Sequence, residues 1–309
     1  MSLFSNRIIG LEVGRNGVGG ALLRSDNGLP QLEQTAFVPL PPDLLRISRR
    51  EPNLLEPDVF VQQVRAVRES LQTGESRVAL SLPDGAGRIA LLELDETWKN
   101  RSEAAEIILW KLKKSLPHEP GDLHLDFQIL LQREEGPSLI MVALVARQIV
   151  EQYENLLYEA GLQPACINLN QVNLVHAFAA DTGDEGITAF VSWYGESLGI
   201  VVAHDGVPLF WRSKYLPAER GGGERIDQEL HGSLEAYHKQ YPGQRCSKVF
   251  YCAPGGHRQA LCGLLTSLWE QVPLVLEADS LYRQRVGAPY QNVPFESMSA
   301  AIAAAAGRV

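Results

Sequence analysis

The residues best suited to chemistry lie near the N-terminus, where a carboxylate precedes a glycine-rich turn. Residues 10–17 read GLEVGRNG between two apolar runs. Backbone N–H groups of such a turn can bind phosphate oxygens, and a carboxylate beside them can organise magnesium and water. Glu12, Gly14, Arg15, Asn16 and Gly17 are therefore candidate ligand-binding residues. The alternative is that Glu12 is an ordinary strand residue and that the two glycines serve turn geometry alone.

Other residue types that often carry chemistry form no convincing arrangement. The four cysteines contain no CxxC pair, which favours free thiols over a zinc site. The seven histidines are scattered, and His231 and His238 are expected on a solvated helix face. Residues 81–85 do not form a nucleophile elbow, and Asp126 is expected to be structural or interfacial. We predict no catalytic residue and no metal site.

The elements that position the turn begin with three strands. Apolar runs at residues 8–13, 18–23 and 34–40, with glycine-rich turns between the first two, predict strands joined as hairpins. A helix is predicted from Pro57, because apolar residues then recur at helical spacing, and a strand follows at residues 77–82. The stretch 41–55 is rich in Pro, Arg and Asn and is expected as an exposed loop.

Residues 87–162 differ in character from the preceding segment. The sequence predicts a strand at 88–94, a helix introduced by Asn100 and Glu103, strands at 123–131 and 139–145, and a helix ending at Gly161. Asn100 with Glu103 three positions later is the pattern of a capping box. We expect this stretch to be an inserted α+β subdomain with its own small core.

The three-strand pattern then returns after a strand at 165–169 and a helix at 172–180. Strands are predicted at 187–193, 198–204 and 208–215, followed by a helix and a strand at 249–252. A helix, a short strand at 274–277, an irregular stretch through Pro294 and a final helix complete the chain. The two halves share one order of elements, which indicates an internal duplication of topology.

Composition excludes several classes of protein. The chain has 309 residues, 45% of them hydrophobic, which favours a folded protein of two domains. Its formal charge of −9, with no Lys/Arg cluster in the sequence, argues against binding to nucleic acid or anionic lipid. No apolar run is long enough to span a bilayer, and no secretory signal is present, so a cytoplasmic location is expected.

The chain resembles the type IV pilus assembly protein PilM family, an actin-like group related to the cell-division protein FtsA. The resemblance lies in IIGLEVGRNGVGGALL at 8–23, RVALSLPDGAGRIALLEL at 77–94, WKLKKSLPHEPGDLHLDFQIL at 110–130, a strand–helix–strand segment at 141–178, and AAIAAAAG at 300–307. It implies an α/β, actin-like (duplicated ribonuclease-H-like) fold. The implied parts are a first half at 1–86 and 163–183, an inserted subdomain at 87–162, and a second half at 184–309.

The resemblance also implies a nucleotide site, from which this sequence departs in three places. Ser192-Trp193-Tyr194 stands where the family has Asp-x-Gly, so the second phosphate turn lacks its carboxylate. The adenosine strand ends at Pro254-Gly255-Gly256, which makes Gly255 and Gly256 candidate nucleotide contacts, although Pro254 removes one backbone donor. After Gly221-Gly222-Gly223 the family's second-half helical subdomain, one wall of the adenine pocket, is missing. We therefore expect weak or no ATP binding, negligible hydrolysis and no bound cofactor.

The family resemblance further implies a scaffold in type IV pilus or related secretion assembly. The expected partner is the N-terminal cytoplasmic tail of a PilN-like inner-membrane protein, lying extended in a groove where the first half meets the insertion, and this partner would recruit the chain to the inner membrane. Strands 85–95 and 123–130 and helix 103–116 are the regions expected to line that groove, and other pilus assembly components are expected as further partners. The alternatives are an active ATPase that binds ATP with magnesium, and a nucleotide-dependent filament protein.

Overall fold

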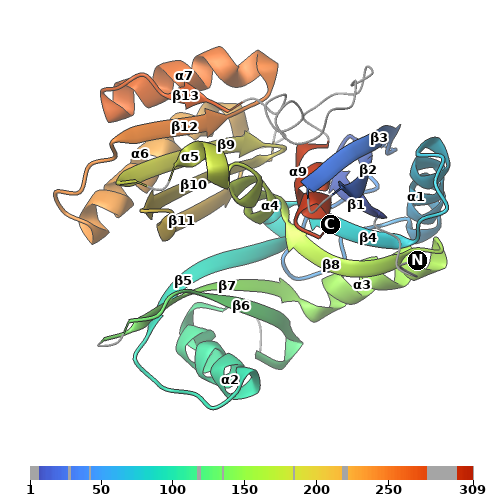
Figure 1. The fold of residues 1–309 in the computed structure, drawn as a ribbon, viewed down its shortest axis with the longest axis horizontal. Helices are drawn as coiled ribbons and strands as arrows, with labels where there is room; N and C mark the ends of the chain where they lie inside the picture. The colour runs from blue at the N-terminus through green and yellow to red at the C-terminus, as the bar shows by residue number, and fades with distance from the viewer. Residues whose placement is uncertain are drawn as a thin grey trace.

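The computed structural model describes residues 7–26, 29–41, 43–116, 120–133, 136–183, 185–217, 222–276 and 298–308. These residues form two five-stranded sheets and one three-stranded sheet (Figure 1). The five-stranded sheets have the orders β3-β2-β1-β4-β8 and β11-β10-β9-β12-β13. In both, the first three strands are antiparallel and the fourth and fifth are parallel to the first. The predicted duplication is therefore present.

The first half is built from strands and one helix that match the apolar runs of the sequence. Its elements are β1 (Arg7–Gly14), β2 (Gly17–Asp26), β3 (Leu29–Pro39), α1 (Pro57–Ser70), β4 (Arg77–Leu82), a 3₁₀ turn η1 (Asp84–Ala86) and β8 (Gln163–Leu169). Successive side chains of a strand point to opposite faces of the sheet. On β1, Ile9, Leu11 and Val13 enter the core that contains α1, whereas Ile8 packs in the core on the other face. The same alternation places Glu12 on that second face.

The segment 41–55 is not the exposed loop that its composition predicts. Leu44, Leu45, Asn53 and Leu54 are buried. Gln152, on the helix α3 (Arg147–Glu159), accepts hydrogen bonds from the backbone N–H groups of Asn53 (2.8 Å) and Leu54 (3.1 Å) and donates one to the Leu54 carbonyl (2.8 Å). One distant side chain thus binds the loop backbone, which its composition alone could not reveal.

The insertion carries the three-stranded sheet, in the order β5-β7-β6. It consists of β5 (Gly87–Leu94), α2 (Arg101–Leu112), two 3₁₀ turns η2 (Lys113–Ser115) and η3 (Pro120–Asp122), β6 (Leu123–Leu131) and β7 (Ser138–Ala146). The predicted cap is present, since the Asn100 side chain accepts a hydrogen bond from the Glu103 N–H at 3.0 Å. Ala104, Ile108 and Leu112 of α2 pack on the sheet in a separate small core.

Helix α3 differs from the predicted domain boundary. We expected it within the insertion at 87–162, but Ile149, Tyr153 and Leu157 lie in the core of the first half together with Phe60 of α1. The rings of Phe60 and Tyr153 meet edge to face at 6.0 Å. The body with its own core is therefore β5 to β7, and α3 belongs by packing to the first half.

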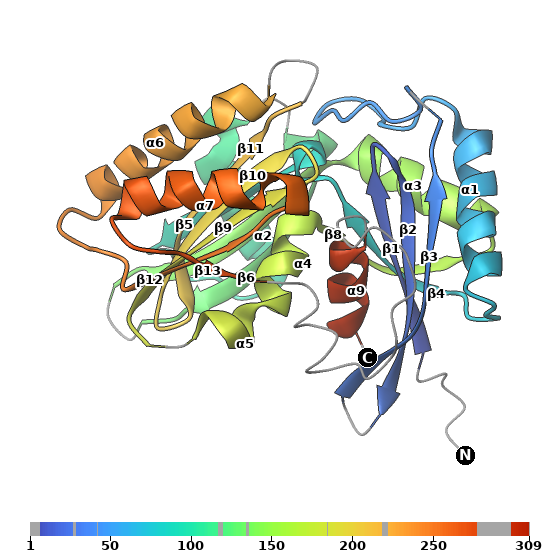
Figure 2. The same ribbon diagram turned by 90° about the horizontal axis from the view of Figure 1, so that it is seen from above.

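Two helices lie between the two large sheets, as Figure 2 shows. They are α4 (Asn170–Ala177) and α9 (Ser299–Ala306). Ile302 and Ala305 of α9 pack on the inner face of the first sheet. On the other side, Ala300 and Ala303 join Leu174 of α4 and residues of the second sheet in one cluster. The halves are thus held together by a shared helical layer.

The second half contains α5 (Ala179–Thr182), β9 (Ile187–Tyr194), β10 (Ser197–His204), β11 (Val207–Tyr215), α6 (Gly222–Gln240), β12 (Lys248–Cys252), α7 (Gly255–Trp269) and β13 (Leu274–Val275). Six residues, 216–221, separate β11 from α6, too few for a helical subdomain. Gly221, Glu277 and the predicted irregular stretch lie outside the described residues. Within the described ranges, no helix has the length and apolar character needed to cross a bilayer.

Candidate functional site

The predicted phosphate turn is a two-residue hairpin that packs on its own sheet. Gly14 pairs with Gly17 across the turn formed by Arg15 and Asn16. A Cβ at Gly17 would lie 2.4 Å from the Phe37 ring and 2.5 Å from the Val38 carbonyl oxygen, so packing alone requires glycine there. A Cβ at Gly14 would meet its nearest neighbour only at 3.8 Å. The glycines are thus explained by turn geometry and by Phe37.

The Glu12 side chain, on β1 of the first half, hydrogen-bonds with a residue of the second half. Its Oε2 accepts a hydrogen bond from the Tyr194 hydroxyl at 2.7 Å and another from the Ala301 N–H at 3.3 Å. Both side chains are buried, with Glu12 4% and Tyr194 7% exposed. Burial raises the pKa of Glu12 to about 8, against the lowering effect of the Tyr194 and Ala301 hydrogen bonds. Burial, followed by the Glu12 carboxyl, raises the pKa of Tyr194 well above its usual value. At pH 7 the pair is therefore neutral.

A second bridge joins the two hairpin turns themselves. The Arg15 guanidinium in the first turn lies 3.2 Å from Oε2 of Glu196 in the second. The Tyr215 hydroxyl donates to the same oxygen at 2.9 Å. Burial and the neighbouring Glu196 raise the pKa of Tyr215 to about 12, so it remains a donor at physiological pH. The turns are linked by an ion pair at their tips and by a neutral pair deeper inside.

Helix α9 approaches the strand that carries Glu12 so closely that only glycine fits beneath it. A Cβ built on Gly10 would lie 1.9 Å from the Ala301 carbonyl oxygen. The N-terminus of α9 therefore lies against the Glu12–Tyr194 pair, with the Ala300 N–H 3.5 Å from the Tyr194 hydroxyl. The first free N–H groups of this helix are directed at that pair.

A buried polar network lies beside this pair, at the start of α4. Ser81 donates to the Asn170 side chain at 2.6 Å and accepts from the Asn173 amide at 2.7 Å. Asp84 accepts from the Gln171 N–H at 2.9 Å. Burial raises the pKa of Asp84 to about 7, opposed by that hydrogen bond, and its charge in turn contributes to the raised pKa of Glu12. The network ties β4 to α4 across the middle of the molecule.

The predicted adenosine contacts lie on the second half. Gly255 and Gly256 begin α7 after Pro254, and a Cβ on Gly256 would meet nothing within 4 Å. The next residue, His257, stacks on Trp193 with ring centroids 4.3 Å apart. Trp193 directly precedes Tyr194 on β9. The structure therefore places these glycines beside the end of β9, with an aromatic pair next to them.

A cavity of about 710 Å³ opens where the first half, the insertion and the second half meet. One wall is β8, which contributes the consecutive residues 164–169, and β8 lies at the edge of its sheet. The facing wall consists of residues of the insertion sheet, namely His124, Asp126, Phe127, Gln128 and Leu130 on β6 and Met141, Ala143 and Val145 on β7. Helix α4, the end of α9, and Pro208 and Trp211 of β11 close it.

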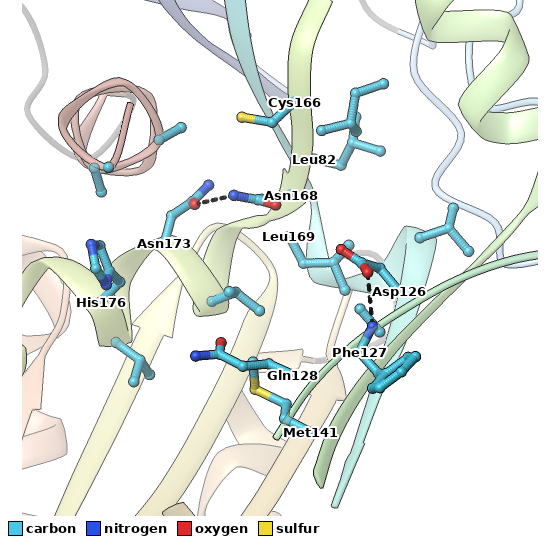
Figure 3. Close-up of a pocket in the computed structure, with 18 of the residues that line it drawn as sticks. Leu82, Asp126, Phe127, Gln128, Met141, Cys166, Asn168, Leu169, Asn173 and His176 are labelled. Carbon is cyan, nitrogen blue, oxygen red and sulfur yellow. Dashed lines mark hydrogen bonds between the residues drawn. The ribbon is translucent and has the colours of Figure 1, made fainter. Parts of the chain in front are cut away.

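The walls of this cavity combine apolar surface with a few polar groups, as Figure 3 shows. Asn168 donates to Asn173 at 3.0 Å, and Asn173 continues into the buried network through Ser81. Trp211 donates its indole N–H to Gln171 at 2.9 Å. The predicted groove was expected along strands 85–95 and 123–130 and helix 103–116. Of the described residues, those of β6 line the cavity, whereas none of β5 or α2 does.

The free edge of β6 is blocked by side chains. The Phe127 N–H donates to Asp126 at 2.9 Å, and the Phe127 carbonyl accepts from Arg101 at 2.8 Å. Arg101 also pairs with the Asp126 carboxylate, and its guanidinium lies 4.3 Å from the centre of the Phe127 ring. Asp126 thus holds this edge through Arg101 and also lines the cavity. An extended chain entering the cavity would find the edge of β8 more accessible than that of β6.

Sequence reasoning missed the polar group at the start of α4 and the bridging role of Tyr194. The signal for the first was available, since NLNQVN at 168–173 places polar residues at the junction of a buried strand and a helix. No local pattern indicates that Tyr194 meets Glu12, 182 positions away. Within the described part of the chain, no three His, Cys, Asp or Glu side chains lie close enough to hold a metal ion.

The chain is similar to known proteins in its structure, whereas its sequence has no match among family models or curated proteins. The structure is similar to a chain of a PilM–PilN type IV pilus biogenesis complex, with a TM-score of 0.81 and 19% identity over 96% of this chain and 97% of the other. It is also similar to a Bacteroides thetaiotaomicron protein with an actin-like ATPase fold and unknown function (TM-score 0.55, 11% identity, 97% and 98% coverage). A third similar structure is the cytoplasmic domain of EpsL, an inner-membrane component of the Vibrio cholerae type II secretion system. Its TM-score is 0.52, with 8% identity over 96% of this chain and 94% of the other.

At these identities the similarity establishes the fold. The expected actin-like architecture, with its duplicated halves and inserted subdomain, is confirmed. The chain has the actin-like fold in the form found in the PilM–PilN complex.

Proposed function

We propose that this chain is a cytoplasmic scaffold of a type IV pilus or related secretion machine, without nucleotide control. Its partner would be the N-terminal cytoplasmic tail of a PilN-like inner-membrane protein, which would recruit it to that membrane. The observation that carries the proposal is the fold shared with the PilM–PilN complex over nearly all of both chains. The similarity to the EpsL domain supports the wider assignment to secretion assembly.

The residues between the halves do not fit ATP with magnesium. Phosphates held between the two turns would need the space that the Glu12–Tyr194 and Arg15–Glu196 bridges span. Oε2 of Glu12 already accepts hydrogen bonds from the Tyr194 hydroxyl and the Ala301 N–H, so this oxygen is engaged within the protein. The short connection between β11 and α6 leaves no subdomain to cover a base. We infer that the halves are held closed by the protein's own side chains.

The cavity at the junction supports binding of an extended peptide. A strand edge offers backbone donors and acceptors to a chain laid beside it, and pockets for alternate side chains add specificity. β8 is such an edge, and the β6–β7 face opposite it supplies both apolar and amide side chains. We infer that the tail lies along β8 and directs alternate side chains toward Gln128, Met141 and Ala143.

Calorimetric titration of the full chain with a synthetic tail peptide tests this proposal. Ala179→Trp and Ala143→Phe each enlarge a side chain that lines the cavity, so each is expected to weaken binding about tenfold or more through lost pocket volume. Ala180→Trp is the matched control, because Ala180 is also exposed and adjacent in α5 but does not line the cavity.

A parallel titration with ATP and magnesium separates the scaffold from its main alternative. We expect no binding at low micromolar nucleotide and no turnover. Tight, magnesium-dependent binding with measurable hydrolysis would instead establish an ATPase. Equal peptide affinity in all three variants would show that the peptide does not bind in the cavity. Absence of peptide binding to the unmodified chain would refute the assignment of the partner.

A further inference from the structure

The structure gathers cationic side chains that the sequence keeps apart. We call this set the basic strip; its members are Arg49, Arg50, Arg88, Lys113, Lys114 and Arg147. Arg88 of β5 donates to the carbonyl and hydroxyl of Ser115 at 2.9 and 3.2 Å, which places it beside Lys113 and Lys114 in η2. Burial and the nearby Arg88 lower the pKa of Arg49.

The strip continues from the loop to the N-terminus of α3. Gln148 donates its amide to the Arg50 carbonyl, and Arg147 directly precedes it, with its guanidinium directed at the Leu123 carbonyl at 3.4 Å. The acidic side chains at the border are partly engaged, since Glu51 pairs with Arg46 and Glu96 with Lys111, while Asp122 lies beside the Arg147 end. Four segments of the chain, from residue 49 to residue 147, thus form one cationic surface.

An exposed tryptophan adjoins the Lys113–Lys114 end of this strip. Trp110 is 73% exposed in the last turn of α2, and the chain continues directly from α2 into η2. The first two residues of η2 are Lys113 and Lys114, both exposed. Helix α2 lies at the periphery, on the face of the insertion sheet away from the cavity (Figure 1). The surface is therefore separate from the peptide site.

We propose that the basic strip with Trp110 docks on a bilayer surface that contains anionic phospholipid. Lysine and arginine side chains near such a surface are attracted to its headgroups, and an indole ring prefers the boundary between headgroups and acyl chains. The patch lies at the C-terminal end of α2 and carries one exposed aromatic ring, whereas single-stranded nucleic acid is bound in grooves with several stacking rings. The proposal does not depend on the identity of any protein partner.

The overall charge of −9 does not oppose this docking strongly. At physiological ionic strength, charges beyond about 8 Å are largely screened, so the cations nearest the bilayer dominate. The acidic composition argued against lipid binding from the sequence alone. The folded arrangement changes that expectation, because it concentrates positive charge on one side.

Co-sedimentation of the full chain with vesicles tests the proposal. Vesicles of phosphatidylcholine alone are compared with vesicles containing added phosphatidylglycerol, at low and at physiological salt. We expect binding to the anionic vesicles only, weakened by salt. Each lysine near an anionic surface strengthens the partition coefficient for vesicles slightly more than about fivefold. Lys113→Gln combined with Lys114→Gln should therefore lower that partition coefficient about thirtyfold.

The control variant carries the same loss of charge elsewhere. Lys239→Gln with Arg245→Gln removes two exposed cations from the second half and should leave binding unchanged. Trp110→Phe should remove most of the blue shift in tryptophan emission that vesicles induce, because Trp110 is the exposed indole. Equal binding to neutral vesicles, or an equal loss in both double variants, would overturn the proposal. Equally tight, lysine-dependent binding to polyglutamate or to single-stranded DNA would overturn it too, in favour of a polyanionic macromolecule.

Discussion

Replacing Glu12 with glutamine should stabilise this protein at neutral pH, although the substitution lies at a buried polar contact. The native carboxyl keeps its proton up to about pH 8, whereas in the unfolded chain it ionises above its ordinary value of 4.5. Rising pH therefore favours the unfolded state through this window. Glutamine has the same shape, accepts from the Tyr194 hydroxyl and the Ala301 N–H, and never ionises.

The expected magnitude follows from the two pKa values. Each pH unit between 4.5 and 8 lowers the free energy of unfolding of the wild-type protein by about 1.4 kcal/mol through Glu12. The glutamine variant should thus be more stable by about 3 kcal/mol at pH 7, and the difference should vanish below pH 4.5 and level off above pH 8. Asp84, with its pKa raised to about 7, adds a similar slope between pH 3.8 and 7 in both proteins.

Urea unfolding at a series of pH values from 4 to 9 measures this difference as a shift in midpoint at unchanged slope. The interval from pH 7 to 8 is the cleanest, because Asp84 no longer contributes there. Glu151→Gln, at an exposed position on α3, is the control and should show no difference. A Glu12 variant that is less stable at every pH, or equally stable at every pH, would show that the native carboxyl is ionised and would refute the neutral bridge.

Three further substitutions test how the site is held. Gly10→Ala should destabilise the protein by about 3 kcal/mol or more in thermal or urea unfolding, because its methyl group would overlap a carbonyl of α9, whereas Gly14→Ala should change stability little. Gln152→Ala should lower the free energy of unfolding by about 1–3 kcal/mol, since two backbone N–H groups lose their acceptor. It should also make the chain cleavable by trypsin at the arginines within residues 46–50. Gln62→Ala, at an exposed position on α1, is the control and should have neither effect. Asn100→Ala should lower stability by about 1 kcal/mol through loss of the α2 cap, and an unchanged unfolding midpoint would show that the cap contributes nothing.

The positions of the regular elements could be predicted from the sequence because they depend on local patterns. Apolar runs at residues 8–13 and 187–193 predict the strands, and helical spacing after Pro57 predicts α1. The repeated order of strands and helix gave the duplication. The domain boundary at 162 was misplaced because α3 is amphipathic, and an amphipathic helix does not specify which neighbouring core its apolar face enters.

The candidate site was predicted only in part. Glu12 and the turn at 14–17 were identified as residues of interest, and their suggested role in nucleotide binding stays a prediction that the ATP titration decides. The polar composition of residues 41–55 predicts an exposed loop, but three hydrogen bonds with Gln152, two accepted and one donated by its side chain, and the burial of Leu44 and Leu54 hold the loop on the first half. Such contacts join residues about a hundred positions apart, beyond the reach of any local pattern.

What the sequence determined by itself was the inventory of strands and helices, their order, and which face of each is apolar, since these follow from the spacing of side chains along one segment. What only the tertiary structure decided was which polar groups lie together: Glu12 with Tyr194, Arg15 with Glu196, and Arg88 near Arg49. The physical reason is that burial and electrostatic effects depend on distance in space. Glu12 keeps its proton because β9 and α9 enclose it, and neither element lies near it in the chain.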